Sequence, residues 1–129
     1  MFPISAPRYN IMTSCDDALA PYVAVTILSI SHSMPDSHID FFLLYHRVSQ
    51  QNLELLYALC EKCPNITLHQ IFVSDQELEP SSLLSRYGGW PEEAYFPAGA
   101  HLLLPDTADL DRIMYLDAGD TLVVKDISP

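Results

Sequence analysis

Residues 9–45 read YNIMTSCDDALAPYVAVTILSISHSMPDSHIDFFLLY, and the hydrophobic pattern of this stretch changes twice. The apolar-weighted run 9–14 predicts a strand, and the residues CDD at 15–17 predict a polar loop after it. The nearly continuous apolar run 39–45 predicts a second strand, because a strand covered on both faces carries apolar residues without alternation.

Helical spacing marks the segments that separate the predicted strands. One helix is predicted over 21–34, with Pro21 suited to its first turn and Pro35 to its end. Ser49 predicts the cap of a second helix, and the run 66–73 predicts a third strand. The apolar faces are Val23, Ile27, Ile30 and Met34 in the first helix, and Leu53, Leu56, Tyr57 and Cys60 in the second. Strands that alternate with helices indicate an α/β fold with a mainly parallel sheet and right-handed crossovers.

A further strand, predicted over 112–116, leads into the turn of the stretch IMYLDAGDTLVVKDI at residues 113–127. Asp117 and Asp120 flank two small residues in this turn, which lets the backbone bend sharply. Carboxylates at the end of a strand in an open α/β sheet lie where ligands bind, and a pair of them suits a hard divalent cation. The alternative, with equal weight on spacing alone, is an ordinary turn in which Asp side chains accept hydrogen bonds from nearby amides.

Three more acids lie near predicted strand ends. Asp16 and Asp17 follow the first strand, where they could cap the first helix or converge with Asp117 and Asp120 at one sheet edge. Asp126, which follows an expected strand at 122–124, is interpreted as a solvated or turn-forming residue.

Composition excludes several classes of protein. The formal net charge is −11 with six Lys and Arg residues, which argues against a nucleic-acid surface. An anionic ligand would therefore need a bridging cation. Residues 1–10 lack the pattern of a secretory signal, and the apolar-rich run 20–30 is too short to span a bilayer, so we expect a cytoplasmic protein without a transmembrane segment.

The three cysteines suit a reducing compartment, because an odd number is a poor basis for a disulfide framework. Cys60 and Cys63 form a C-x-x-C pair without a second pair, so two half-buried thiols at a helix end are favoured over a zinc or redox site. Cys15 is given no chemical role.

The chain has the length of one domain, 1–129. Pro, Gly and aromatic residues crowd the segment 74–97, which favours either a ligand-facing loop or a plain crossing, and 98–104 predicts a short helix. A sheet whose ligand site is formed by its last strand is normally followed by elements that cover the ligand, so we expect this chain to be the front part of a longer protein.

Three segments, in this order, resemble family 8 glycosyltransferases, which are retaining enzymes with the GT-A fold. The opening NIMTSCDDALAPYVAVTILSI is similar to the first strand, loop and helix of that family. The segment EAYFPAGAHLLLPDTADLDRIMYLD resembles its approach to the metal motif, and YLDAGDTLVVKDI resembles its DxD region. The resemblance implies a Rossmann-like nucleotide-diphospho-sugar transferase fold, truncated at the C-terminus.

The resemblance also implies a function and a set of residues. Ser14 and Asp16 would line the pocket for uracil and ribose, and Asp117 and Asp120 would hold Mn²⁺ or Mg²⁺ against the diphosphate, with Asp117 also near the ribose. The expected reaction is transfer of a hexose from a UDP-sugar to a surface-glycan, lipopolysaccharide-type or lipid-linked saccharide acceptor, in the cytoplasm or at the inner face of the membrane. No single residue is assigned as catalytic.

Two other functions stay open. A non-catalytic nucleotide-binding or assembly fragment could bury its unfinished sheet edge against a second copy as a homo-oligomer. The string LDAGDTLV is also similar to the signature of haloacid dehalogenase-like phosphatases, although Gly119 and Asp120 stand in exchanged order.

Overall fold

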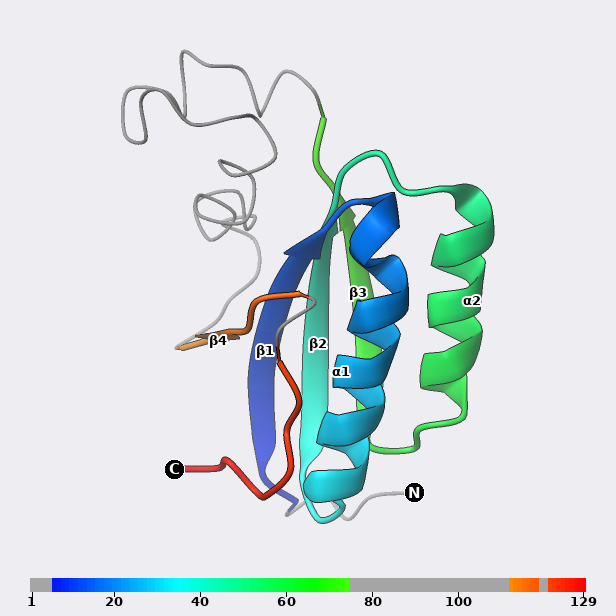
Figure 1. Ribbon diagram of the computed structural model, residues 1–129. Coiled ribbons are helices and arrows are strands. Elements are labelled where there is room, and N and C mark those ends of the chain that lie inside the picture. Colours follow the sequence, from blue (N-terminus) through cyan, green and yellow to red (C-terminus); the bar gives the residue numbers. More distant parts are fainter. Residues whose placement is uncertain (1–5, 75–111, 119–120) are drawn as a thin grey trace, which may run out of the picture.

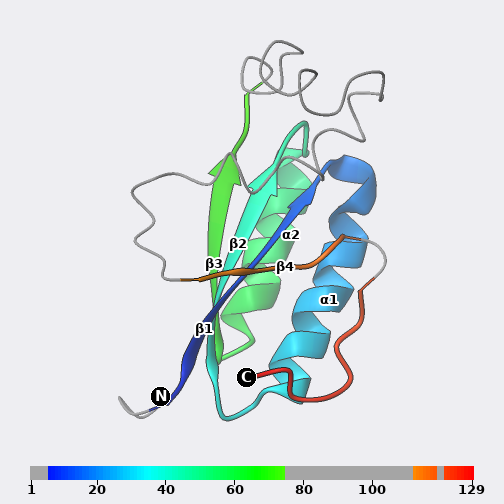
Figure 2. The same cartoon turned by 90° about the vertical axis from the view of Figure 1, so that its left-hand side faces the viewer.

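A parallel sheet with both α-helices on one side forms the described part of the chain (Figures 1 and 2). The computed structural model describes residues 6–74, 112–118 and 121–129. In these ranges the strand order is β3-β2-β1-β4, and every neighbouring pair is parallel. The elements are β1 (Arg8–Cys15), a 3-10 turn (Asp17–Leu19), α1 (Ala20–Ser33), β2 (His38–Tyr45), α2 (Gln50–Glu61), β3 (Ile66–Phe72) and β4 (Met114–Tyr115). The predicted α/β class with a parallel sheet is confirmed.

Local sequence signals begin and end the helices where expected. Pro21 lies in the first turn of α1, where a missing backbone N–H costs nothing. The helix ends before Pro35, and the Met34 N–H bonds to the Ile30 carbonyl. The Ser49 hydroxyl accepts a hydrogen bond from the Asn52 amide at 3.2 Å and so caps α2, as its position predicts.

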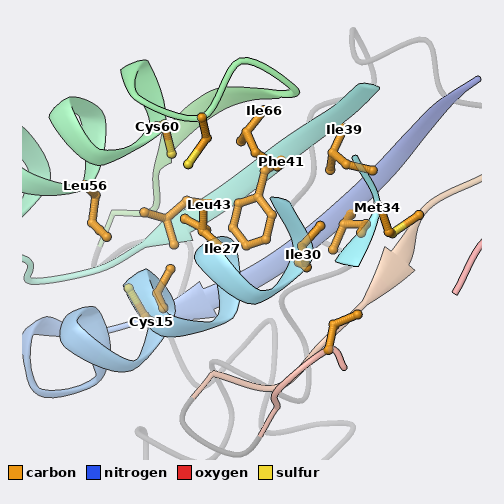
Figure 3. Close-up of a cluster of buried hydrophobic side chains, with 14 of the residues drawn as sticks. Cys15, Ile27, Ile30, Met34, Ile39, Phe41, Leu43, Leu56, Cys60 and Ile66 are labelled. Carbon is orange, nitrogen blue, oxygen red and sulfur yellow. The ribbon is translucent and has the colours of Figure 1, made fainter. Parts of the chain in front are cut away.

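The main core lies between the sheet and the two helices (Figure 3). Phe41 is 0 % exposed and sits in the middle of this cluster, between apolar side chains of α1 and α2. Successive strand residues point to opposite faces, so every second residue of β1 and β2 reaches this core. Its buried members from the sheet and helices include Ile11, Cys15, Val23, Ile27, Ile30, Ile39, Phe41, Leu43, Leu56 and Cys60.

The other face of β2 is also closed to solvent. Phe42 and Leu44 are 8 % and 0 % exposed, and the Phe42 ring stacks on His69 at a centroid distance of 4.6 Å. Nearer the start of the strands, Asp40 accepts hydrogen bonds from Arg8 and pairs with His69. The prediction that this strand is covered on both faces is confirmed.

Two sequence expectations are wrong. Tyr57 is 53 % exposed, because it lies at the edge of the apolar face of α2 beside a surface groove of about 360 Å³ that also touches Tyr45 and Gln70. The segment 122–124 forms no strand, because the backbone N–H and carbonyl of Val123 bond to Ser29 and Ser33 of α1 instead of to a neighbouring strand. The expected helix at 98–104 and the segment 75–97 lie outside the described residues.

Asn65 joins the end of α1 to the start of β3. Its side chain is buried, donates to the carbonyls of Ser31 and Met34 at 3.1 and 3.0 Å, and accepts from the Ser31 hydroxyl at 2.6 Å. The last carbonyls of a helix have no partner within the helix, so this side chain supplies one. Its own carbonyl also accepts from Ile39, at 2.7 Å, which connects the same corner to β2.

Replacing Asn65 with Ala should therefore lower the free energy of unfolding by about 2 kcal/mol, because several buried polar groups lose their partners at once. Urea unfolding measures this loss, with Glu61→Ala on the exposed side of α2 as the control. A change no larger than that of the control would show that water replaces the Asn65 contacts at no cost.

Candidate functional site

The carboxyl ends of β1 and β4 lie side by side and form the candidate site. Met12 pairs with Tyr115 in the parallel ladder, and the Leu116 amide donates to the Met12 carbonyl at 3.0 Å. Two positions beyond this pair lie Ser14 on β1 and Asp117 after β4. Ligands of open α/β sheets bind beyond this edge.

A hydrogen bond of 3.0 Å between the Ser14 and Tyr115 hydroxyls connects the two strand ends. Ser14 is 1 % exposed, so its hydroxyl is not open to solvent. Burial raises the pKa of Tyr115 and the bond with Ser14 lowers it, while the negative charge of Asp117 and a hydrogen bond with the Asp117 side chain raise it further. The phenol therefore stays protonated at neutral pH and can donate a hydrogen bond.

Sequence reasoning missed Tyr115 as a site residue and treated it only as part of a buried strand. The signal was present, since Tyr115 and Asp117 stand two positions apart and such residues share one face of a strand.

Asp117 is exposed, and a side-chain hydrogen bond closes the start of its turn. The Thr121 hydroxyl donates to the Asp117 carbonyl at 2.9 Å. The Asp117 side chain lies just beyond the end of β4 and forms a hydrogen bond with Tyr115, and its role as a metal ligand stays a prediction. Asp120, the second predicted metal ligand, lies outside the described residues.

Asp16 acts as a cap directly after β1. Its Oδ1 accepts from the Leu19 amide at 3.1 Å and begins the 3-10 turn that leads into α1. Asp16 therefore caps this 3-10 turn, whereas α1 begins after Leu19 without a side-chain cap, so the expected cap of the first helix itself is not formed. The partly exposed Asp16 side chain lies at the same sheet edge as the predicted nucleotide pocket.

Asp17 bonds to the start of α2. Its Oδ1 accepts from the Ser49 amide at 2.8 Å and from the Asn52 side chain at 2.9 Å. The Ser49 amide, with these side-chain bonds, lowers the pKa of Asp17, and the positive end of the helix also favours the carboxylate. In the described residues no group of three or more His, Cys, Asp and Glu side chains could hold a metal ion, so the expected meeting of Asp16 and Asp17 with Asp117 is not seen there.

The cysteines are buried free thiols rather than half-buried ones. Burial raises the pKa of Cys15 to about 12, and the charges of Asp16 and Asp17 add to this rise. Burial and the neighbouring Cys63 likewise raise the pKa of Cys60 to about 12. Thiols in this state are protonated at neutral pH, which fits the packing role expected of them.

Chemically, the described part of the site offers one exposed carboxylate, one capping carboxylate and a part-buried pair of hydroxyl groups. Carboxylate oxygens suit hard cations such as Mg²⁺ and Mn²⁺, so Asp117 fits the predicted metal as a ligand. In the described ranges neither α1 nor α2 has the length and apolar character needed to cross a bilayer.

The Ser14 and Tyr115 pair can be tested by a double-mutant cycle. Tyr115→Phe should lower the free energy of unfolding by about 1–3 kcal/mol, because the buried Ser14 hydroxyl loses its partner. In the double variant with Ser14→Ala the loss should be smaller than the sum of the two single losses. Additive losses in urea unfolding would mean that the two hydroxyls are not coupled.

Asp17 should make stability depend on pH. Because its pKa is lowered in the folded protein, the unfolded chain takes up the proton first, and the stabilisation is lost as the pH falls through the folded pKa. The difference in unfolding free energy between the wild type and Asp17→Asn should therefore shrink from about pH 7 to about pH 3. Asp36→Asn, an exposed acid before β2, controls for net charge; a constant difference would contradict the prediction.

Comparison with known proteins yields matches among solved structures. An active-site mutant of LgtC matches 91% of this chain with 26% sequence identity and a TM-score of 0.62. The galactosyltransferase LgtC in complex with donor and acceptor sugar analogues matches 84% at 26% identity, with a TM-score of 0.58. The bifunctional glycosyltransferase WbbM matches 91% at 21% identity and a TM-score of 0.59, which concerns the fold alone.

No protein-family model matches the chain, and comparison with curated protein sequences finds no match. The chain spans 39%, 20% and 37% of the lengths of the LgtC mutant, WbbM and the LgtC complex, respectively. Each of these neighbours is a glycosyltransferase, and the expected resemblance to such enzymes is confirmed. The described sheet and helices thus have the GT-A, Rossmann-like fold of glycosyltransferases such as LgtC.

Proposed function

We propose that this chain is the donor-binding part of a retaining glycosyltransferase that uses a UDP-sugar and Mn²⁺ or Mg²⁺. The observation that carries the proposal is the exposed Asp117 carboxylate, held directly after β4 and beside the end of β1 in a glycosyltransferase fold. The transferred group is a hexose, and the acceptor is a surface-glycan or lipopolysaccharide-type saccharide, which includes lipid-linked forms.

The proposed division of roles follows the resemblance to family 8 glycosyltransferases. Asp117 and Asp120 hold the cation, while Ser14 and Asp16 form the wall toward the uracil and ribose. A bound divalent cation offsets the negative charge that develops on the UDP leaving group. The Ser14 hydroxyl is buried, so its proposed role is to hold the Tyr115 phenol at the wall of the pocket by their hydrogen bond.

The proposal covers a donor half only. This chain spans 39% of the LgtC mutant. In this proposal, the acceptor site and any further metal ligand lie in other parts of the parent enzyme. We assign residues 1–129 to one nucleotide-sugar-binding domain in the cytoplasm, peripheral to the membrane in the parent. The proposal includes a homo-oligomer in which the unfinished edge of the sheet packs against a second copy of the chain.

Calorimetric titration of UDP into this chain, with and without Mn²⁺, tests the site. Mn²⁺ should strengthen UDP binding. Asp117→Asn should weaken the binding of UDP in the presence of Mn²⁺ by at least about tenfold, because a charged ligand of the cation is lost. Asp120→Asn should act in the same direction.

The control variant is Asp126→Asn, which changes an exposed acid that accepts from the Ser128 amide, in a segment that lies near the start of β1. It changes the net charge equally and should leave UDP binding intact. Metal-independent binding that both Asp117→Asn and Asp120→Asn leave unchanged would refute the site, and release of phosphate from an aryl phosphate would favour a phosphatase instead.

A further inference from the structure

One side of α1 carries hydroxyl groups that bind the segment after the acidic turn. The Thr26 hydroxyl donates to the Thr121 carbonyl at 2.7 Å, and the Ser33 hydroxyl donates to the Val123 carbonyl at 2.8 Å. Between them, the Ser29 hydroxyl accepts from the Val123 amide at 3.0 Å. These three positions are spaced by three and four residues, which places them on one face of the helix.

These bonds do for the segment what a neighbouring strand would do. Backbone groups near the interior need partners, and here the helix supplies them. Val123 is 7 % exposed and packs into the main core, so the segment is fixed by burial as well. Figure 1 shows it in orange to red, running along α1 after β4.

The first of the hydroxyl contacts reaches the candidate site in two steps. Thr26 bonds to the carbonyl of Thr121, and the Thr121 hydroxyl bonds to the Asp117 carbonyl at 2.9 Å. On the other side of Asp117, the Leu116 amide is fixed to β1 at 3.0 Å. Asp117 is therefore held between two anchors, one on the sheet and one on α1.

The Thr26 hydroxyl donates to Thr121 instead of to a carbonyl of the preceding turn of α1. Threonine within a helix can bond to the carbonyl of its own preceding turn, which leaves no link to other segments. Thr26 is 2 % exposed, at a place where an apolar side chain would be buried equally well. Its hydroxyl instead points to the segment that leaves the acidic turn.

We propose that Thr26 is a positioning residue that fixes Thr121 and, through the bond of Thr121 to the Asp117 carbonyl, the backbone of Asp117. Its consequence for ligand binding rests on the function proposed above, whereas the anchoring itself does not. α1 then serves both halves of the site, since the Asp16 cap precedes it and Thr26 lies along its length.

Hydrogen exchange on the ligand-free chain tests the anchor. Thr26→Val keeps the branched shape without the hydroxyl and should speed exchange at the backbone amides of 117–118 and 121–123 roughly tenfold, because one bond to a loop end is lost. Thr26→Ser keeps the hydroxyl and should restore slow exchange. Unchanged exchange in Thr26→Val, or equal acceleration throughout β1, would overturn the anchoring role.

Ser33→Ala is the matched control, because it removes one bond of the same set farther from Asp117. Its faster exchange should be confined to residues near Val123. If Ser33→Ala speeds exchange at 117–118 as much as Thr26→Val does, the segment as a whole, rather than Thr26, holds Asp117.

Titration with UDP and Mn²⁺ separates this inference from the proposed function. Thr26→Val should weaken only the Mn²⁺-dependent part of UDP binding, by about three- to tenfold, while Thr26→Ser and Ser33→Ala stay near the wild type. Wild-type protein that binds no UDP would refute the proposed function and leave exchange to decide the anchor. Wild-type affinity in Thr26→Val would refute its positioning role for the ligand.

Discussion

The parallel pairing of β1 with β4 is the contact on which the candidate site depends. The ladder joins only Ile11 with Met114 and Met12 with Tyr115, yet it brings together segments about 100 positions apart. Closing so long a loop costs entropy, so a two-residue ladder needs other contacts beside it. The bond between Ser14 and Tyr115 and the hydroxyls of α1 lie directly after this pairing and hold both strand ends in register.

The acids near this edge of the sheet have different structural roles. Asp16 begins the 3-10 turn before α1, and Asp17 binds the start of α2, so Asp17 links the beginnings of the two helices. Asp117 has its backbone fixed and its side chain exposed. A site that binds a cation gains from this arrangement, because a fixed backbone limits the freedom that its ligand must lose on binding.

Much of the fold could be predicted from the sequence, because periodicity and caps are local signals. The strands before and after α1, its proline boundaries and the Ser49 cap all lie where the sequence indicates them. The partners of Tyr115 and Thr26 were out of reach, since they depend on which distant segments meet. For the same reason residues 122–124 resembled a strand, although helix side chains bind them. Asp117 could be predicted as a ligand because its position after a strand is itself informative, whereas the hydroxyl groups that hold its backbone carry no sequence motif.

Charge gives an independent reason to expect a cation at this edge. Two unit charges about 4 Å apart interact by roughly 1 kcal/mol in water and about 4 kcal/mol near a protein surface. A diphosphate that approaches Asp16 and Asp117 would therefore be repelled, in a chain whose net charge is already −11. Arg47 follows β2 at the carboxyl edge, but one guanidinium carries less charge than a diphosphate. If this edge binds a nucleoside diphosphate, a divalent cation between carboxylate and phosphate turns that repulsion into attraction, and Asp117 is the described residue placed to hold it.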